Sequence, residues 1–282
     1  MTGSGYFAPP ARPGAGPGPP PPGPPARRRS RVPVVVLLLV VLGMVVAAVV
    51  SATSKVQAVV VLGDVIAVEQ PAPAAAGWSA GYVDEDGNPG RWDPCAPIPF
   101  VVQAGWIPDA GRADLAEALR RLSEASGLRF VDEGDTDELP SRDRPAFQPE
   151  RYGQRWAPLL IGWVPAASTD IGLGGGVQGV SAAVAVPSTG GPALVSGQVA
   201  LDASNRLAGG FGAGTTDGEV LMHELAHAVG LGHVLDPTQV MYPQTTSSES
   251  VFGAGDRAGL AAVGAAAGCH AAPPPRPLRL EG

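Results

Sequence analysis

The spacing of hydrophobic and polar positions changes several times after about residue 98, which predicts a domain of alternating strands and helices. Between residues 109 and 126 the apolar residues recur at the spacing of one helix face, and Gly127 follows as the expected helix end. Short apolar or alternating runs predict strands at residues 98–103, 128–132, 158–164, 180–186 and 194–201. The last two runs are expected to form an antiparallel pair at a sheet edge.

Two further helices are predicted nearer the C-terminus. Thr216 and Glu219 form an S/T-x-x-E capping box, and apolar residues follow, so a helix is expected to begin there. A weaker, alanine-rich helix is expected over residues 255–267, whereas the polar, proline-bearing segment 133–157 is expected to be a loop. Strands interleaved with three helices indicate an α/β (α+β) fold class.

The first 54 residues differ in composition from the rest of the chain. Ten prolines and six glycines fall within the first 25 residues, so residues 1–31 are expected to form a disordered tail. Residues 32–54 carry no charge, and Val34 to Val50 are seventeen consecutive Val, Leu, Ala, Met and Gly residues. At 1.5 Å per residue such a stretch crosses most of a ~30 Å hydrocarbon core, which predicts one transmembrane helix over residues 32–54.

Four arginines just before this segment place the N-terminal side in the cytoplasm, so the remaining chain is expected outside, at the cell membrane in a single-pass arrangement. The alternative is a signal peptide cleaved near Ser51, which would release a secreted protein. Both alternatives put the later residues outside the cytoplasm. There we expect a stalk at residues 55–91, a folded domain at 92–270 and a disordered tail at 271–282.

Charge and cysteine content indicate which classes of partner and which cellular compartment to expect for this chain. Beyond the N-terminal arginines the chain carries 14 basic and 26 acidic side chains without a basic stripe, which argues against nucleic-acid partners. The two cysteines, Cys95 and Cys269, both fall in the exported part, and an even count in an oxidising compartment predicts a disulfide. The alternatives are a free pair, or Cys95 acting as a ligand that blocks a metal site.

The most informative motif is H-E-x-x-H-x-x-G-x-x-H, formed by His223, Glu224, His227, Gly230 and His233. Side chains four apart on a helix share a face, so the first two histidines aim at one point, as two ligands of a tetrahedral metal require. The glycine can end the helix with φ > 0, and the third histidine can then supply a third nitrogen. The glutamate is placed to take a proton from a metal-bound water. This pattern predicts one catalytic Zn²⁺ and a hydrolase, against the alternative of coincidence or an inactive remnant.

A second motif, Val240-Met241-Tyr242-Pro243, follows the last of these histidines after six residues. Together the two motifs resemble the metzincin metalloproteases, and the matrixin branch in particular. The resemblance implies that Met241 packs as a floor beneath the zinc; Tyr242 is not expected to be a ligand. Matrixins often place Ser directly after the third histidine, where this chain has Val234.

The resemblance also carries expectations about other metals and about the fold. Only His270 remains outside the motif, so the second, structural zinc of animal matrixins is not expected. Calcium has weak support, since residues 172–176 and Asp202 offer oxygen ligands without a calcium-loop pattern. Over residues 92–269 the resemblance implies a metzincin-like catalytic domain, with a mixed, mostly parallel, twisted sheet above the active-site helix.

The function expected from these features is that of an extracellular, membrane-anchored zinc metalloendopeptidase that hydrolyses protein or peptide substrates. An edge strand within residues 180–201 would align an extended peptide by main-chain pairing. Three alternatives stay open from sequence: a zinc hydrolase of cell-wall peptides, a non-catalytic surface binding module stabilised by zinc, and a scaffold whose proline-rich tail recruits cytoplasmic partners.

Overall fold

The computed structural model describes residues 77–212, 214–244 and 250–278 of the 282-residue chain. The predicted tail 1–31, the predicted transmembrane segment 32–54 and most of the predicted stalk lie outside the described residues. Within the part that the structure describes, no helix is both long enough and apolar enough to cross a membrane.

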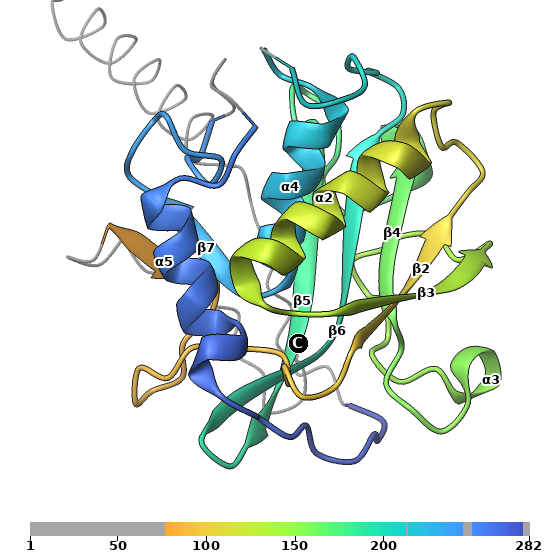
Figure 1. The fold of residues 1–282 in the computed structure, drawn as a ribbon. Coiled ribbons are helices and arrows are strands. Elements are labelled where there is room, and N and C mark those ends of the chain that lie inside the picture. The colour runs from red at the N-terminus through yellow and green to blue at the C-terminus, as the bar shows by residue number, and fades with distance from the viewer. Residues whose placement is uncertain (1–76, 213, 245–249, 279–282) are drawn as a thin grey trace, which may run out of the picture. The chain divides into compact units, whose positions relative to one another are not determined.

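The centre of the described domain is a five-stranded sheet in the order β3-β2-β4-β6-β5 (Figure 1). Its strands are β2 (Ile98–Gln103), β3 (Phe130–Thr136), β4 (Leu159–Val164), β5 (Gly179–Ser188) and β6 (Gly191–Asp202). The pairs β2–β3, β2–β4 and β4–β6 are parallel, and β5 runs antiparallel to β6 at one edge. The mixed, mostly parallel sheet with an antiparallel edge pair is therefore confirmed.

Two long helices, α2 (Gly111–Ser126) and α4 (Asp217–Ala228), lie side by side against this sheet (Figure 1). Gly127 ends α2 in the left-handed region with φ of 72°, as the sequence predicted. Every residue of α4 is buried. Leu122 of α2 and Leu221 of α4 are fully buried and belong to one core cluster with apolar residues of the sheet. The helix that carries the His-Glu motif is thus held at the centre of the core.

A third helix, α5 (Ala254–Val263), is shorter than the helix predicted over residues 255–267. Gly264 interrupts it with an extended backbone, φ −102° and ψ −155°, and the 3-10 turn η2 (Ala265–Ala267) follows. A Cβ atom at position 264 would clash with the carbonyl of Ser126, so the chain passes close to the end of α2 where α5 stops. Two shorter helical turns are α3 (Pro149–Tyr152) and η1 (Ala166–Ser168).

The folded domain begins earlier than the predicted start at residue 92. β1 (Trp78–Ala80) pairs antiparallel with β7 (Leu231–Val234), directly after α4. Tyr82 and Trp92 are buried in the main core, and the Trp92 indole N–H donates to the carbonyl of Ala228 at 2.9 Å. Residues 77–91 of the predicted stalk therefore contribute to the domain in this structure.

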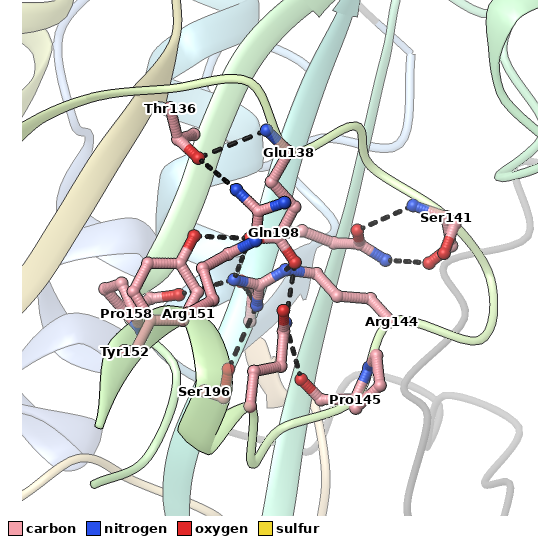
Figure 2. Close-up of polar contacts among 12 residues, drawn as sticks. Thr136, Glu138, Ser141, Arg144, Pro145, Arg151, Tyr152, Pro158, Ser196 and Gln198 are labelled. Atoms are coloured by element: carbon pink, nitrogen blue, oxygen red, sulfur yellow. Dashed lines mark hydrogen bonds and ion pairs between the residues drawn. The ribbon is translucent and has the colours of Figure 1, made fainter. Parts of the chain in front are cut away.

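The loop from residue 137 to 157 contains an ion pair whose arginine is hydrogen-bonded to the sheet (Figure 2). Arg144 and Glu138 are 3.0 Å apart, with side chains 4% and 10% exposed. Arg144 also donates to the carbonyl of Pro158 and to Ser196 of β6, and Tyr152 donates to Glu138 at 2.5 Å. Burial raises the pKa of Glu138, but the charge of Arg144 and the neighbouring donors outweigh it and leave the pKa below its ordinary value. Each buried charge therefore has its partners, as burial requires.

The C-terminal segment is also part of the domain as far as residue 278. Cys95 and Cys269 form the predicted disulfide, with Cα atoms 5.4 Å apart. Beyond it, the indole N–H of Trp156 donates to the carbonyl of Pro273 at 2.9 Å, and Leu278 packs against a small second core cluster on β5 and β6. Residues 271–278 of the predicted tail thus contact the domain in this structure, while residues 279–282 lie outside the description.

Candidate metal centre

Three histidine side chains meet at the C-terminal end of α4. His223 and His227 lie four residues apart on α4, and His233 lies on β7. Their ring centroids are 4.5 Å, 4.9 Å and 5.5 Å apart, and one nitrogen from each ring lies within 4.8 Å of the others. The two helical histidines are buried and the third is half-buried. The structure thus brings together the three residues that the sequence predicted as ligands.

Hydrogen bonds to backbone carbonyls fix the protonation of the two buried rings. His223 Nδ1 lies 2.7 Å from the carbonyl oxygen of Val240, and His227 Nδ1 lies 2.7 Å from that of Leu231. A carbonyl oxygen only accepts, so each neutral ring carries its proton on Nδ1. Both Nε2 atoms then present lone pairs, and they face each other across 2.9 Å. Two lone pairs at this distance repel unless a proton or a cation lies with them, so the donor set fits a metal ion.

The distance between these two nitrogens also suits zinc. Zinc–nitrogen bonds of about 2.0–2.1 Å at a tetrahedral angle separate two ligand nitrogens by roughly 3.3 Å. The observed 2.9 Å is within a few tenths of an ångström of that value. Three imidazole nitrogens in a partly open site are the ligand set typical of catalytic zinc, which keeps a fourth position for water.

The turn after α4 depends on Gly230. Its φ is 103°, and a Cβ atom at this position would clash with the carbonyl of Gly90, which passes directly over the turn. Only glycine satisfies both conditions without strain. The turn reverses the chain into β7 and so brings His233 back towards α4, as the motif predicted.

The strand β1 holds β7 and its histidine in place. Trp78 pairs with Val234 and Ala80 with Leu231 across the two strands. The Ser79 hydroxyl donates to the carbonyl of His233 at 3.1 Å. Sequence analysis missed this support, because a three-residue strand has no measurable periodicity and its partner lies about 150 residues away.

Glu224, the predicted general base, is 7% exposed and lies on α4 between the two helical histidines. The Ser181 hydroxyl of β5 donates to its Oε2 at 2.9 Å. The edge strand β5 therefore runs against the part of α4 that carries the base.

The motif Val240-Met241-Tyr242-Pro243, here called the Met-turn, is hydrogen-bonded to Asp256 of α5. Met241 is fully buried, and its carbonyl accepts from the backbone N–H of Val234 at 2.9 Å. The Asp256 carboxylate accepts from the backbone N–H groups of Met241 (3.2 Å), Val240 (3.1 Å) and Gly253 (2.9 Å). Burial raises the pKa of Asp256, although these three hydrogen bonds act in the opposite direction. Sequence analysis missed Asp256; an acid three residues after the Gly253 helix start was the available signal.

Two buried acids lie in the first turn of α4. Burial, followed by repulsion from Asp114, raises the pKa of Asp217 to about 6. Burial raises the pKa of Glu219 to about 7, and its Oε2 atom is buried without a hydrogen-bond partner among the described residues. Thr216 accepts from the backbone N–H of Glu219 at 3.2 Å, so the predicted N-cap is present.

The cysteines are not available to a metal. Asp93, Cys95 and Cys269 lie close together, but both sulfur atoms are taken up in the disulfide. The alternative in which Cys95 blocks the zinc site is therefore wrong for this structure. The pairing instead closes the domain at its two ends, 174 residues apart.

An α/β domain in which two histidines of one helix meet a third histidine just after it is the arrangement expected of a zinc metallopeptidase of the metzincin type. The sequence model of the matrixin family matches residues 146–262, which include the whole His-Glu motif and the Met-turn. This part of the chain is therefore similar to the matrixins, and the match indicates a zinc metalloendopeptidase, a hydrolase. A comparison with curated proteins gave no match.

Proposed function

We propose that this protein is a membrane-anchored, extracellular zinc endopeptidase in which His223, His227 and His233 bind the ion and Glu224 is the general base. The observation that carries the proposal is that the Nε2 atoms of His223 and His227 lie 2.9 Å apart, with a third imidazole beside them. The matrixin match over the same residues supports zinc as the metal.

His223, His227 and His233 would hold a zinc ion, and this ion would supply the Lewis acidity that lowers the pKa of a bound water towards about 7 and polarises the scissile carbonyl. The carbonyls of Val240 and Leu231 hold the two helical imidazoles in the tautomer that leaves Nε2 for the metal. Glu224 accepts the proton of the attacking water and later delivers it to the departing amine. Its burial beside the histidines keeps bulk water away from this proton transfer.

The substrate is proposed to be an extended peptide that pairs with β5. This strand is the last in the sheet order, and within the described residues no strand pairs with its outer edge. An open edge supplies backbone N–H and C=O groups in a row, which an added peptide strand can satisfy. Contact of β5 with Glu224 through Ser181 brings this edge to the proposed base.

The proposed location rests on the N-terminal sequence and on the cysteines. The uncharged segment 32–54 follows a cluster of arginines, which favours an anchor with the later residues outside the cytoplasm. The Cys95–Cys269 disulfide supports an oxidising compartment for the domain. Protease accessibility of the domain on intact cells, compared with lysed cells, tests the orientation; protection on intact cells would contradict it.

The enzymatic part of the proposal is tested with the full-length protein purified in detergent. We expect one zinc per chain by elemental analysis and cleavage of a peptide library that a chelator stops and added zinc restores. Glu224→Ala should keep the zinc and lose at least about a hundredfold in kcat. Glu150→Ala, which removes an exposed glutamate on α3, is the matched control and should cleave normally.

A metal-free wild-type protein under zinc-replete conditions would reject the metal site. Full activity of Glu224→Ala would reject the general base. Cleavage of purified cell-wall peptide crosslinks with no cleavage of casein or the library would redirect the proposal to a cell-wall hydrolase.

A further inference from the structure

The strand β5 lies against α4 at the position of the proposed base. Along β5 alternate side chains point to the same face, and residues 179 and 181 both face Glu224. The Ser181 hydroxyl donates to Glu224 Oε2 at 2.9 Å. Ser181 is 3% exposed and Glu224 is 7% exposed, so this hydrogen bond forms away from bulk water. A hydroxyl that donates to a carboxylate in such surroundings makes a charge-assisted, directional contact.

The neighbouring position on the same face contributes by having no side chain. A Cβ atom at Gly179 would lie 2.7 Å from Glu224 Cγ and 3.0 Å from its Oε1. It would also meet Val220, one turn earlier on α4. Any larger residue at position 179 would therefore push the glutamate out of its present rotamer. β5 therefore restricts the conformations open to the Glu224 side chain, and Ser181 of this strand donates a hydrogen bond to it.

We propose that Ser181 is a positioning residue for the hydrolytic step. Its hydroxyl donates to Oε2 of Glu224 and so fixes the orientation of the carboxylate that is to accept the proton, while Gly179 provides the room for this rotamer. The inference rests on the proposed role of Glu224 as general base. Because the same strand is proposed to pair with the substrate, β5 would fix the position of the general base relative to the scissile peptide.

Catalytic constants test this role. Ser181→Ala should lower kcat by about tenfold or more with KM changed less than about twofold, because the variant loses alignment of the base and not substrate pairing. Ser181→Thr retains a hydroxyl and should recover most of the lost kcat. The matched control is Ser196→Ala on β6: Ser196 is also buried and hydrogen-bonded, but to Arg144. It should lose stability without losing kcat.

A second measurement does not depend on activity. In the chelator-treated protein, Ser181→Ala should lower the Tm by roughly 3–6 °C, as expected for a hydrogen bond to a charged group in a domain of this size. In a Glu224→Ala background the same substitution should lower the Tm by less than half as much, because the partner is already absent.

The possible outcomes distinguish failure of the positioning role of Ser181 from failure of the proposed peptidase function. An equal Tm loss in both backgrounds would show that Ser181 does not act through Glu224 and would overturn the inference. A kcat for Ser181→Ala equal to that of an active wild type would overturn it as well, and so would a folded, zinc-loaded Ser181→Thr that is no better than Ser181→Ala. An inactive wild-type protein would instead reject the proposed function, and the positioning role with it.

Discussion

Replacement of Asp256 by Ala tests how the Met-turn is held. The carboxylate is fully buried and accepts three backbone N–H groups at 2.9–3.2 Å, two of them from the Met-turn itself. Each buried donor left without a partner costs about 1–3 kcal/mol, and removal of the buried charge recovers part of that sum. We therefore expect a loss of about 3–5 kcal/mol in the free energy of unfolding, or about 10 °C in Tm.

The same substitution should weaken metal binding. The carbonyl of Val240 orients the His223 ring, and the Asp256 carboxylate accepts a hydrogen bond from the backbone N–H of Val240. Loss of such an outer contact typically lowers metal affinity by about 10- to 100-fold. Denaturant unfolding of the metal-free protein measures the first effect, and competition with a zinc chelator of known affinity measures the second.

Asp236→Ala is the matched control, because this acid lies just before the Met-turn but is exposed. It should change stability by less than about 0.5 kcal/mol. Asp256→Asn keeps one acceptor oxygen and should fall between the control and Asp256→Ala. An unfolding midpoint for Asp256→Ala no lower than that of Asp236→Ala would refute the reasoning.

Three further predictions follow from buried or strained positions. Burial raises the pKa of Glu219 from 4.5 to about 7, so Glu219 loses its proton at lower pH in the unfolded chain than in the folded protein. This difference lowers the free energy of unfolding: the loss is absent below pH 4.5, grows between pH 4.5 and 7, and reaches about 3 kcal/mol above pH 7. Glu219→Gln should therefore raise the Tm at pH 8 and hardly change it at pH 4.5; an equal shift at both pH values would contradict this origin. Gly230→Ala should cost at least about 3 kcal/mol, measured by denaturant unfolding, because φ is 103° and the carbonyl of Gly90 leaves no room; near-normal stability would show that the turn can relax. Replacing Cys95 and Cys269 with Ser should cost about 2–5 kcal/mol by the same assay, and an unchanged midpoint would mean that the crosslink restrains little of the unfolded chain.

The parts of the fold that the sequence predicted well are those set by residues close together in the chain. The helix over residues 109–126 and its end at Gly127 follow from apolar spacing and one glycine. The spacing within the His-Glu motif likewise predicts which side chains share a helix face. The alternating runs before and after residue 190 predicted the β5–β6 pair. In each case the deciding interactions span few residues.

The parts that escaped prediction depend on distant contacts. β1 is too short for a pattern, and only its pairing with β7 makes it a strand. β3 extends to Thr136 through acidic residues, because an exposed edge strand does not need apolar alternation. α5 stops at Gly264, where the chain passes close to the end of α2. The role of Asp256 similarly depends on how α5 meets the Met-turn.

The position of the disulfide determines what a self-cleavage event would do to this peptidase. A nick in any surface loop between Cys95 and Cys269 leaves both fragments covalently joined, so they migrate together on a non-reducing gel. The exposed residues 85–87 lie before the first cysteine, and β1 lies before them. A single scission there would free β1 to dissociate and remove the support of His233. Self-cleavage at residues 85–87 would therefore be expected to inactivate the protein more readily than cleavage between the two cysteines.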